Sequence, residues 1–291
     1  MYDMVKSGIE YANSPTDRYI NENGQTDETV KFKNWTEDNI SVYQGDSRKI
    51  PDENEYDAVI TDPPYYNNII YSELSDFFYV WQKILLEDEY EGFDTAHTPR
   101  AESIVSNPAE GKGRAEFEVE LKQAFGAVER ALKPDGSLVF TYHHSDSESW
   151  GELLEALCET GFEVTAAYPI SADIQKFTKG AAVSFDIIIV ARPAGEREPI
   201  SWNALRRRIH RTADDVRDAL EENRDLSAGD VGVIEMGKCF QEYSKHHGAV
   251  RRAGEEMTAK EVVAEIYGII QENAVGEQDV YLDLLGYANP T

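Results

Sequence analysis

Two hydrophobic periods mark the middle of the chain. In Asp57–Thr61 the apolar residues are consecutive, as in a strand that is buried on both faces. Across Ser72–Leu86 large apolar residues recur every three or four positions, which predicts an amphipathic helix. Because such a stripe normally faces a protein interior, we expect Phe77, Phe78 and Trp81 of this helix to lie in the core.

The same patterns predict further elements on both sides of this region. The predicted strands are Ile40–Tyr43, Ser137–Tyr142, Phe162–Tyr168 and Phe185–Ala191, and the predicted helices are Glu116–Leu132, Ser147–Thr160, Ala204–Asn223, Lys238–His246 and Ala259–Asn273. Strands and helices alternate until the last two strands, which have no helix between them. This order predicts an α/β fold with a mostly parallel sheet and an antiparallel pair at one edge.

Polar and turn-forming segments divide the chain. Residues 1–35 are polar and show no sustained period, so we expect a weakly ordered lead-in. The α/β domain is predicted to span residues 36–195, followed by a boundary at Pro193–Pro199 and a smaller helical C-terminal region over residues 200–291. Lys133–Gly136, with its proline and glycine, predicts a turn that ends a helix.

The composition narrows the class of protein. The 291 residues include 55 acidic and 28 basic side chains, for a net charge of -27, yet 41% are hydrophobic, which excludes a disordered polyanion. This acidity would repel nucleic acid in dilute salt, or it reflects adaptation to concentrated salt, where surface charges are screened. We favour the second interpretation, that of a halophilic protein, because the acidic residues are spread along the whole chain.

The remaining counts bear on location and metals. No apolar run reaches the roughly 18 residues of a membrane span, and the N-terminus has no secretory pattern. Only Cys158 and Cys239 are present, too few for a disulfide framework or a zinc ribbon. We expect a cytoplasmic protein with no metal site.

The segment with the clearest chemistry is Asp62-Pro63-Pro64-Tyr65, directly after the buried strand. In open α/β sheets ligands bind beyond the carboxyl ends of the strands, which is where this tetrapeptide falls. A carboxylate and a backbone carbonyl that accept both N–H groups of a nucleobase amine can make its nitrogen tetrahedral and nucleophilic. Asp62 supplies the carboxylate, Pro63 the carbonyl, and Tyr65 an aromatic face for a flipped base, while Pro64 helps to fix the backbone.

This motif resembles the catalytic motif of amino-group DNA methyltransferases, whose aspartate form is typical of adenine-N6 enzymes. The longer stretch from Thr61 to Trp81, TDPPYYNNIIYSELSDFFYVW, is similar to a family of large, zinc-ribbon-containing adenine-specific DNA methylases. The similarity continues in LKPDGSLVFTYHHSD, GFEVTAAYPI and GKCFQEYSKHHG. The resemblance implies a Rossmann-like methyltransferase sheet, S-adenosylmethionine as cofactor and DNA as substrate.

Several further residues become candidates for binding. By its position, Asp46 resembles the acidic residue that contacts the adenine end of the cofactor. Tyr66 and Asn67 follow the motif, and His143 follows a strand beside the expected crevice, so all three are candidate substrate contacts. The densest basic cluster is either a DNA phosphate contact or an ion-paired helix. It consists of Arg206, Arg207, Arg208 and Arg211.

One expected part of a methyltransferase is missing from the sequence. No glycine-rich turn between a strand and a helix precedes Ile40, and a loop near Gly237 would have only a single glycine. The sheet in this chain is therefore expected to be incomplete, and we hypothesise that another polypeptide supplies the cofactor loop. Two alternatives remain open: a non-catalytic DNA-binding or assembly subunit that retains the motif, and a methyltransferase acting on RNA or on cytosine N4.

Overall fold

The computed structural model describes the central part of the chain and short stretches before it. The described residues are Lys6, 16–20, 25–30, Ser41, Tyr43, 45–66, 70–90, 92–142, 147–171, 185–221 and 228–274. They fall into two compact units, Met1–Gly45 and Asp46–Thr291, each of which is taken by itself.

The first unit contains an antiparallel pair of strands, β1 (Thr16–Ile20) and β2 (Thr26–Val30), in which Thr16 pairs with Val30. The sequence predicted no regular element here. The predicted strand Ile40–Tyr43 lies partly outside the described residues, and its described members Ser41 and Tyr43 are not in a strand.

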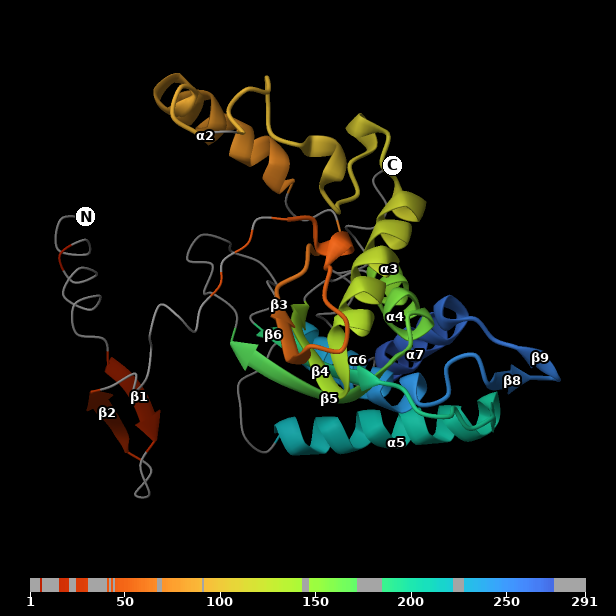
Figure 1. Ribbon diagram of the computed structural model, residues 1–291. Coiled ribbons are helices and arrows are strands. Elements are labelled where there is room, and N and C mark those ends of the chain that lie inside the picture. The colour runs from red at the N-terminus through yellow and green to blue at the C-terminus, as the bar shows by residue number, and fades with distance from the viewer. Residues whose placement is uncertain are drawn as a thin grey trace. The chain divides into compact units, whose positions relative to one another are not determined.

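The second unit follows the predicted order of strands and helices. Its strands are β3 (Tyr56–Thr61), β4 (Leu132–Tyr142), β5 (Phe162–Ser171), β6 (Phe185–Pro193), β7 (Ile200–Ser201), β8 (Val250–Arg252) and β9 (Glu255–Glu256). Its α-helices are α2 (Tyr71–Leu86), α3 (Arg114–Ala131), α4 (Ser147–Glu159), α5 (Trp202–Glu221), α6 (Ala228–Ser244) and α7 (Ala259–Ala274), and its short 3-10 helices are η2 (Ser47–Lys49), η3 (Arg100–Glu102) and η4 (Pro108–Glu110). The chain therefore has a mixed α/β fold (Figure 1).

Four strands form the main sheet in the order β3-β4-β6-β5. β3 and β4 are parallel, whereas β6 is antiparallel to both of its neighbours. The predicted antiparallel pair at one edge is confirmed. β3, β4 and β5 run in the same direction, as predicted for a mostly parallel sheet, and β6 is the reversed one of these four described strands. Because β6 inserts between β4 and β5, two of the three ladders are antiparallel.

The predicted turn at Lys133–Gly136 is instead a bulge inside β4. Tyr56 of β3 pairs with Leu132, and Ala58 pairs with Ser137, so the intervening residues of β4 are accommodated by a shift in register. A Cβ on Gly136 would come within 3.0 Å of the Lys133 carbonyl oxygen and 3.1 Å of the Tyr56 carbonyl oxygen, so this close approach of backbones favours glycine.

One face of the sheet is packed with helices. Phe140 and Tyr142, which point to the same face of β4, contact Phe125 of α3 and Trp150 of α4, at ring-centroid distances of 5.7 and 4.7 Å. Trp150 in turn contacts Phe240 of α6 at 5.3 Å. These aromatic contacts tie α3, α4 and α6 to one hydrophobic core.

α6 lies directly on the sheet. A Cβ on Gly237 would be 3.2 Å from side-chain atoms of Ala167 in β5 and Ile187 in β6. Gly237 is thus a packing glycine within a helix, and the possibility of a cofactor loop at this position is wrong.

The predicted helical C-terminal region is present as α5, α6 and α7. These helices share the hydrophobic core of the sheet, and the chain between them also forms the small sheet β7-β8-β9, which the sequence did not predict. Among the described residues, no helix combines the length and the apolar composition needed to cross a membrane.

α2 departs from its predicted role. Phe77, Phe78 and Trp81 are 66, 62 and 62% exposed, so the expectation that they lie in the core is wrong. The helix instead buries Asp76 and Tyr79 on its other side, because these two side chains dock against the segment that follows α2.

Candidate active site

Asp62 lies at the carboxyl end of β3, where the sequence placed it. One carboxylate oxygen, Oδ1, accepts hydrogen bonds from the hydroxyl of Thr141 at 2.5 Å and from the hydroxyl of Tyr65 at 2.7 Å. The two hydroxyl oxygens are themselves 2.9 Å apart. Because Thr141 belongs to β4 and Tyr65 to the loop after β3, this triangle fixes the carboxylate relative to two parts of the sheet.

The Tyr65 hydroxyl is a hydrogen-bond donor in this triangle. Burial raises its pKa above the usual range for tyrosine, and the neighbouring Asp62 carboxylate raises it further. The ring is half-buried and packs edge-on against Tyr142, with centroids 5.3 Å apart. The structure therefore gives Tyr65 a role in holding Asp62, in addition to the predicted stacking on a base.

Two acceptors of the motif are left open. Within the described part of the chain, neither Oδ2 of Asp62 nor the Pro63 carbonyl has a hydrogen-bond donor, and the Asp62 side chain is exposed. Oδ1 anchors the Asp62 side chain, which leaves Oδ2 and the Pro63 carbonyl as two acceptors that can receive both N–H groups of a planar amine.

Tyr66 has a structural role in this conformation. Its φ of 57° is in the left-handed region, which is rare for a residue with a Cβ. The side chain is 7% exposed, its hydroxyl accepts a hydrogen bond from Nε of Arg114 at 2.9 Å, and its ring packs against Phe117. This buried anchor holds the strained turn directly after the motif and keeps the ring away from the exposed Asp62.

Asp46 is committed to local contacts. Its carboxylate caps η2 by accepting from the backbone N–H of Arg48 at 2.9 Å, and it also pairs with the side chains of Arg48 and Lys49. These hydrogen bonds to Arg48 hold the pKa of the Asp46 carboxyl well below its usual range. Both oxygens are engaged, so the predicted contact with a cofactor amine lacks a free acceptor here.

The remaining candidate residues are of two kinds. Asn67 and His143 lie outside the described residues. The four arginines Arg206, Arg207, Arg208 and Arg211 are exposed on α5, and Arg208 shares a hydrogen bond with His246 at 3.2 Å. Arg206, Arg207 and Arg211 make no ion pair with a described residue, which favours an open cationic surface over an ion-paired helix.

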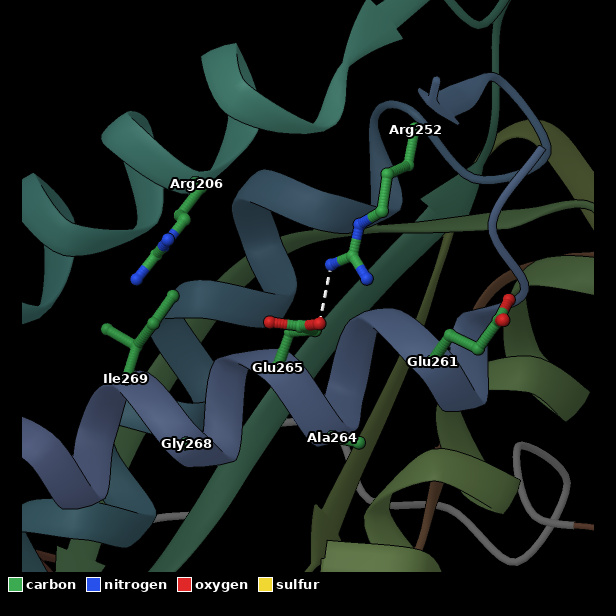
Figure 2. Close-up of a pocket in the computed structure, with 7 residues that line it drawn as sticks. All are labelled: Arg206, Arg252, Glu261, Ala264, Glu265, Gly268 and Ile269. Carbon is green, nitrogen blue, oxygen red and sulfur yellow. Dashed lines mark hydrogen bonds and ion pairs between the residues drawn. The ribbon is translucent and has the colours of Figure 1, made fainter. Parts of the chain in front are cut away.

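A groove of about 330 Å³ opens between α5 and α7 (Figure 2). Arg206 and Arg252 line it from one side and Glu261 and Glu265 from the other, and Arg252 pairs with Glu265 at 2.5 Å. Its walls carry charges of both signs and it contains no residue of the Asp62 motif, so it is a surface feature separate from the candidate site.

The site's residues fit an amine substrate but not the implied cofactor. No glycine-rich turn follows a strand at the carboxyl edge of the described sheet, and Asp46 is already engaged. No cluster of three potential metal ligands is present among the described side chains either. The described residues thus offer acceptors for an amine but no recognisable site for that cofactor.

Thr141 is the site residue that the sequence analysis missed. Replacing Thr141 with valine keeps the shape but removes one donor to a charged oxygen, a loss worth about 1.5–3 kcal/mol. If Asp62 is catalytic, we expect the rate constant of its reaction to fall about 10- to 100-fold. KM and the thermal midpoint should change little. Single-turnover kinetics measure this, with Thr141→Ser as the control that restores the hydroxyl; equal losses in both variants would contradict it.

Comparisons with known proteins give weak matches. No family model matches the chain, and neither does any curated protein. Two crystal structures of a protein from Thermus thermophilus, provisionally described as a DNA modification methylase, are similar to it. One has 14% identity and a TM-score of 0.30 over 60% of this chain and 60% of that chain. The other has 15% identity and a TM-score of 0.28 over 77% and 83%. With TM-scores this low, neither match assigns a function to the chain.

Proposed function

We propose that this chain is the catalytic-motif portion of an S-adenosylmethionine-dependent DNA methyltransferase that acts on adenine N6. The observation that supports it is the Asp62 carboxylate: one oxygen is held by two hydroxyls, while the other oxygen and the Pro63 carbonyl receive no hydrogen bond from a described residue. An exocyclic amine is a poor nucleophile because its lone pair is delocalised into the ring. Two acceptors that draw its N–H groups out of the ring plane localise that lone pair.

Each residue of the site has a distinct part in this proposal. Asp62 and the Pro63 carbonyl orient the amine, and the Asp62 carboxylate can take the proton that the amine loses. Tyr65 holds Asp62 through its hydroxyl and offers the exposed part of its ring to the flipped base. Thr141 positions the same carboxylate from β4.

DNA would be held by a local cationic surface. The basic cluster on α5 consists of four exposed arginines, which can contact DNA phosphates even though the whole chain has a net charge of -27: Arg206, Arg207, Arg208 and Arg211. In a halophile's cytoplasm screening would weaken the repulsion between the remaining acidic surface and DNA.

Nucleoside mass spectrometry tests the reaction and separates it from its rivals. Deleting the gene for this chain from its own cells should remove N6-methyladenine from their DNA and leave other methylated nucleosides unchanged. Loss of N4-methylcytosine, or of a methylated nucleoside from RNA, would instead support the rival substrates. Unchanged nucleosides in both DNA and RNA would favour a non-catalytic subunit.

A further inference from the structure

The turn directly after the Asp62 motif is held from three directions. Tyr66 has a φ of 57°, in the left-handed region that disfavours a residue with a Cβ. Its carbonyl oxygen accepts a hydrogen bond from the backbone N–H of Ser106 at 3.2 Å, its hydroxyl accepts one from Arg114, and its ring packs edge-on against Phe117. Strained residues with this many supports cluster at functional sites, where they fix the direction of the neighbouring chain.

Arg114 provides the charged support. It is the first residue of α3, a helix whose position is fixed by buried residues that include Phe117, Leu121 and Phe125. From there the guanidinium group contacts Tyr66 in two ways, because Nε donates to the hydroxyl at 2.9 Å and the guanidinium carbon lies 5.5 Å from the ring centroid. The two contacts together fix where the Tyr66 side chain lies relative to α3.

Glu152 of α4 lies beside Arg114. Its side chain is 5% exposed, and one carboxylate oxygen is 4.0 Å from Nε of Arg114. Because the carboxylate is buried, water screens its attraction to the guanidinium group less than it would at the surface. Glu152 therefore favours the orientation in which Arg114 contacts Tyr66, and it connects the turn to α4.

A shared peptide group transmits this support to Asp62. Tyr65 and Tyr66 are consecutive, and the planar peptide between them turns as a unit when φ of Tyr66 changes. The Tyr65 hydroxyl donates to Oδ1 of Asp62 at 2.7 Å, and the Tyr65 ring packs against Tyr142. A change in the backbone at Tyr66 would therefore move the hydroxyl that holds Asp62.

We propose that Arg114, oriented by Glu152, is a positioning residue of the candidate active site. It keeps Tyr66 in the left-handed conformation, and through Tyr66 it keeps the Tyr65 hydroxyl on the Asp62 carboxylate. The guanidinium group acts through the two tyrosines, so its contribution to the rate is the preorganisation of the acceptors for the amine. The expected effect on the rate rests on the proposed function, whereas the expected effect on the turn does not.

Two variants of the full chain test this role at one hydrogen bond. Arg114→Met removes the donor, and Tyr66→Phe removes the acceptor but keeps the ring on Phe117. We expect each to lower the single-turnover rate constant of methyl transfer at least about tenfold, with the DNA concentration for half-maximal rate unchanged. The double variant should be no slower than Arg114→Met, because both changes remove the same interaction.

Hydrogen exchange of the Ser106 amide gives a readout that needs no activity. Because this N–H donates to the Tyr66 carbonyl, its exchange should be at least about tenfold faster in Arg114→Met and in Tyr66→Phe. A role in stability alone would accelerate distant amides as well, such as that of Ala194, which donates to the Gly161 carbonyl at 2.7 Å.

Arg130→Met is the matched control. It alters an exposed arginine in the last turn of the same helix, whose side chain donates to the Gly126 carbonyl at 3.0 Å. The rate constant and the exchange of the Ser106 amide should both stay at their wild-type values in this variant. Urea unfolding shows whether each variant is folded, and Tyr66→Phe, the milder change, keeps the test valid if Arg114→Met does not fold.

Any of four results would overturn the proposal. They are unchanged exchange at Ser106, equal acceleration at Ser106 and Ala194, faster exchange at Ser106 with an unchanged rate constant, and a weaker affinity for DNA in place of the slower step. The last result would make Arg114 a phosphate contact. Failure of the proposed function is distinguishable from these: the wild-type protein would then transfer no methyl group to DNA, while exchange at Ser106 would still decide whether Arg114 holds the turn.

Discussion

Under the proposed function, methyl transfer by the protein purified from its own cells is expected to fall by at least about 10²–10³-fold when Asp62 is replaced by alanine. The variant loses the acceptor that would orient the amine and the group nearest to its departing proton. Its fold should be kept, because Asp62 is exposed and the hydroxyls of Tyr65 and Thr141, whose oxygens are 2.9 Å apart, can hydrogen-bond to each other once the carboxylate is removed. Single-turnover transfer of labelled methyl groups to DNA measures the effect.

Two further variants make this result specific. Asp62→Asn keeps the size of the side chain but removes its charge and one acceptor, so we expect most of the activity to be lost. Asp57→Ala is the matched control: it alters a carboxylate on the same strand that is 86% exposed and pairs with Lys133, away from the motif. Retained activity in Asp62→Ala, or equal losses in Asp62→Ala and Asp57→Ala, would contradict the role of Asp62.

The position of Asp62 could be predicted from the sequence because its causes are local. A short apolar run predicts a strand, and two prolines end it, so the motif must follow the strand directly. The expectation that this strand is buried on both faces is wrong, because all of its residues except Val59 are exposed. The same holds for α3, α4, β5 and β6, whose periodic patterns are long enough to identify each element. The sequence did not predict the hairpin of β1 and β2, because its strands, TDRYI and TDETV, are short and mostly polar.

Contacts between distant residues could not be read from the pattern. Thr141 is 79 positions from Asp62, and it becomes its neighbour only through the register in which Thr61 pairs with Phe140. This register places the next residues on the two strands, Asp62 and Thr141, side by side. The burial of Tyr66 likewise depends on Phe117 and Arg114, about fifty positions away.

α2 shows why periodicity does not identify the surface that covers a stripe. Its spacing correctly predicted a helix with an apolar side, but periodicity cannot say which body covers that side. Asp76 and Tyr79 decide the orientation, since they hydrogen-bond to the segment after the helix and turn the apolar stripe outward.

The largest effect on stability is expected from removing Arg217. The side chain of Glu235, on α6, has no exposed surface and forms an ion pair with Nε of Arg217 on α5, supported by a second hydrogen bond of 3.1 Å to Oε2. Arg217 also donates to the Ile270 carbonyl of α7 at 3.3 Å. Arg217→Met leaves a buried carboxylate without this partner, so the free energy of unfolding should fall by about 3–5 kcal/mol at pH 8.

The pH dependence of this loss identifies its cause. Burial raises the pKa of Glu235 from 4.5 to about 7, even though Arg217 acts to lower it. The folded protein therefore holds a proton between these values that the unfolded chain has lost, and the contribution of Glu235 to stability decreases as the pH rises through this range. Removing Arg217 should raise the pKa of Glu235 further. The loss in free energy of unfolding relative to wild type should therefore be large at pH 8 and small at pH 5.

Urea unfolding at both pH values, in concentrated salt, measures these differences. The double variant Arg217→Met/Glu235→Leu should recover much of the stability at pH 8, because it replaces a buried charge by an apolar side chain. A single variant whose stability is within 0.5 kcal/mol of wild type at pH 8, or a loss of stability that is independent of pH, would contradict the role of the pair.

Since this pair fastens α5 to α6, its loss should also disturb the helix that carries Arg206, Arg207, Arg208 and Arg211. The same variant should therefore weaken DNA binding more at pH 8 than at pH 5.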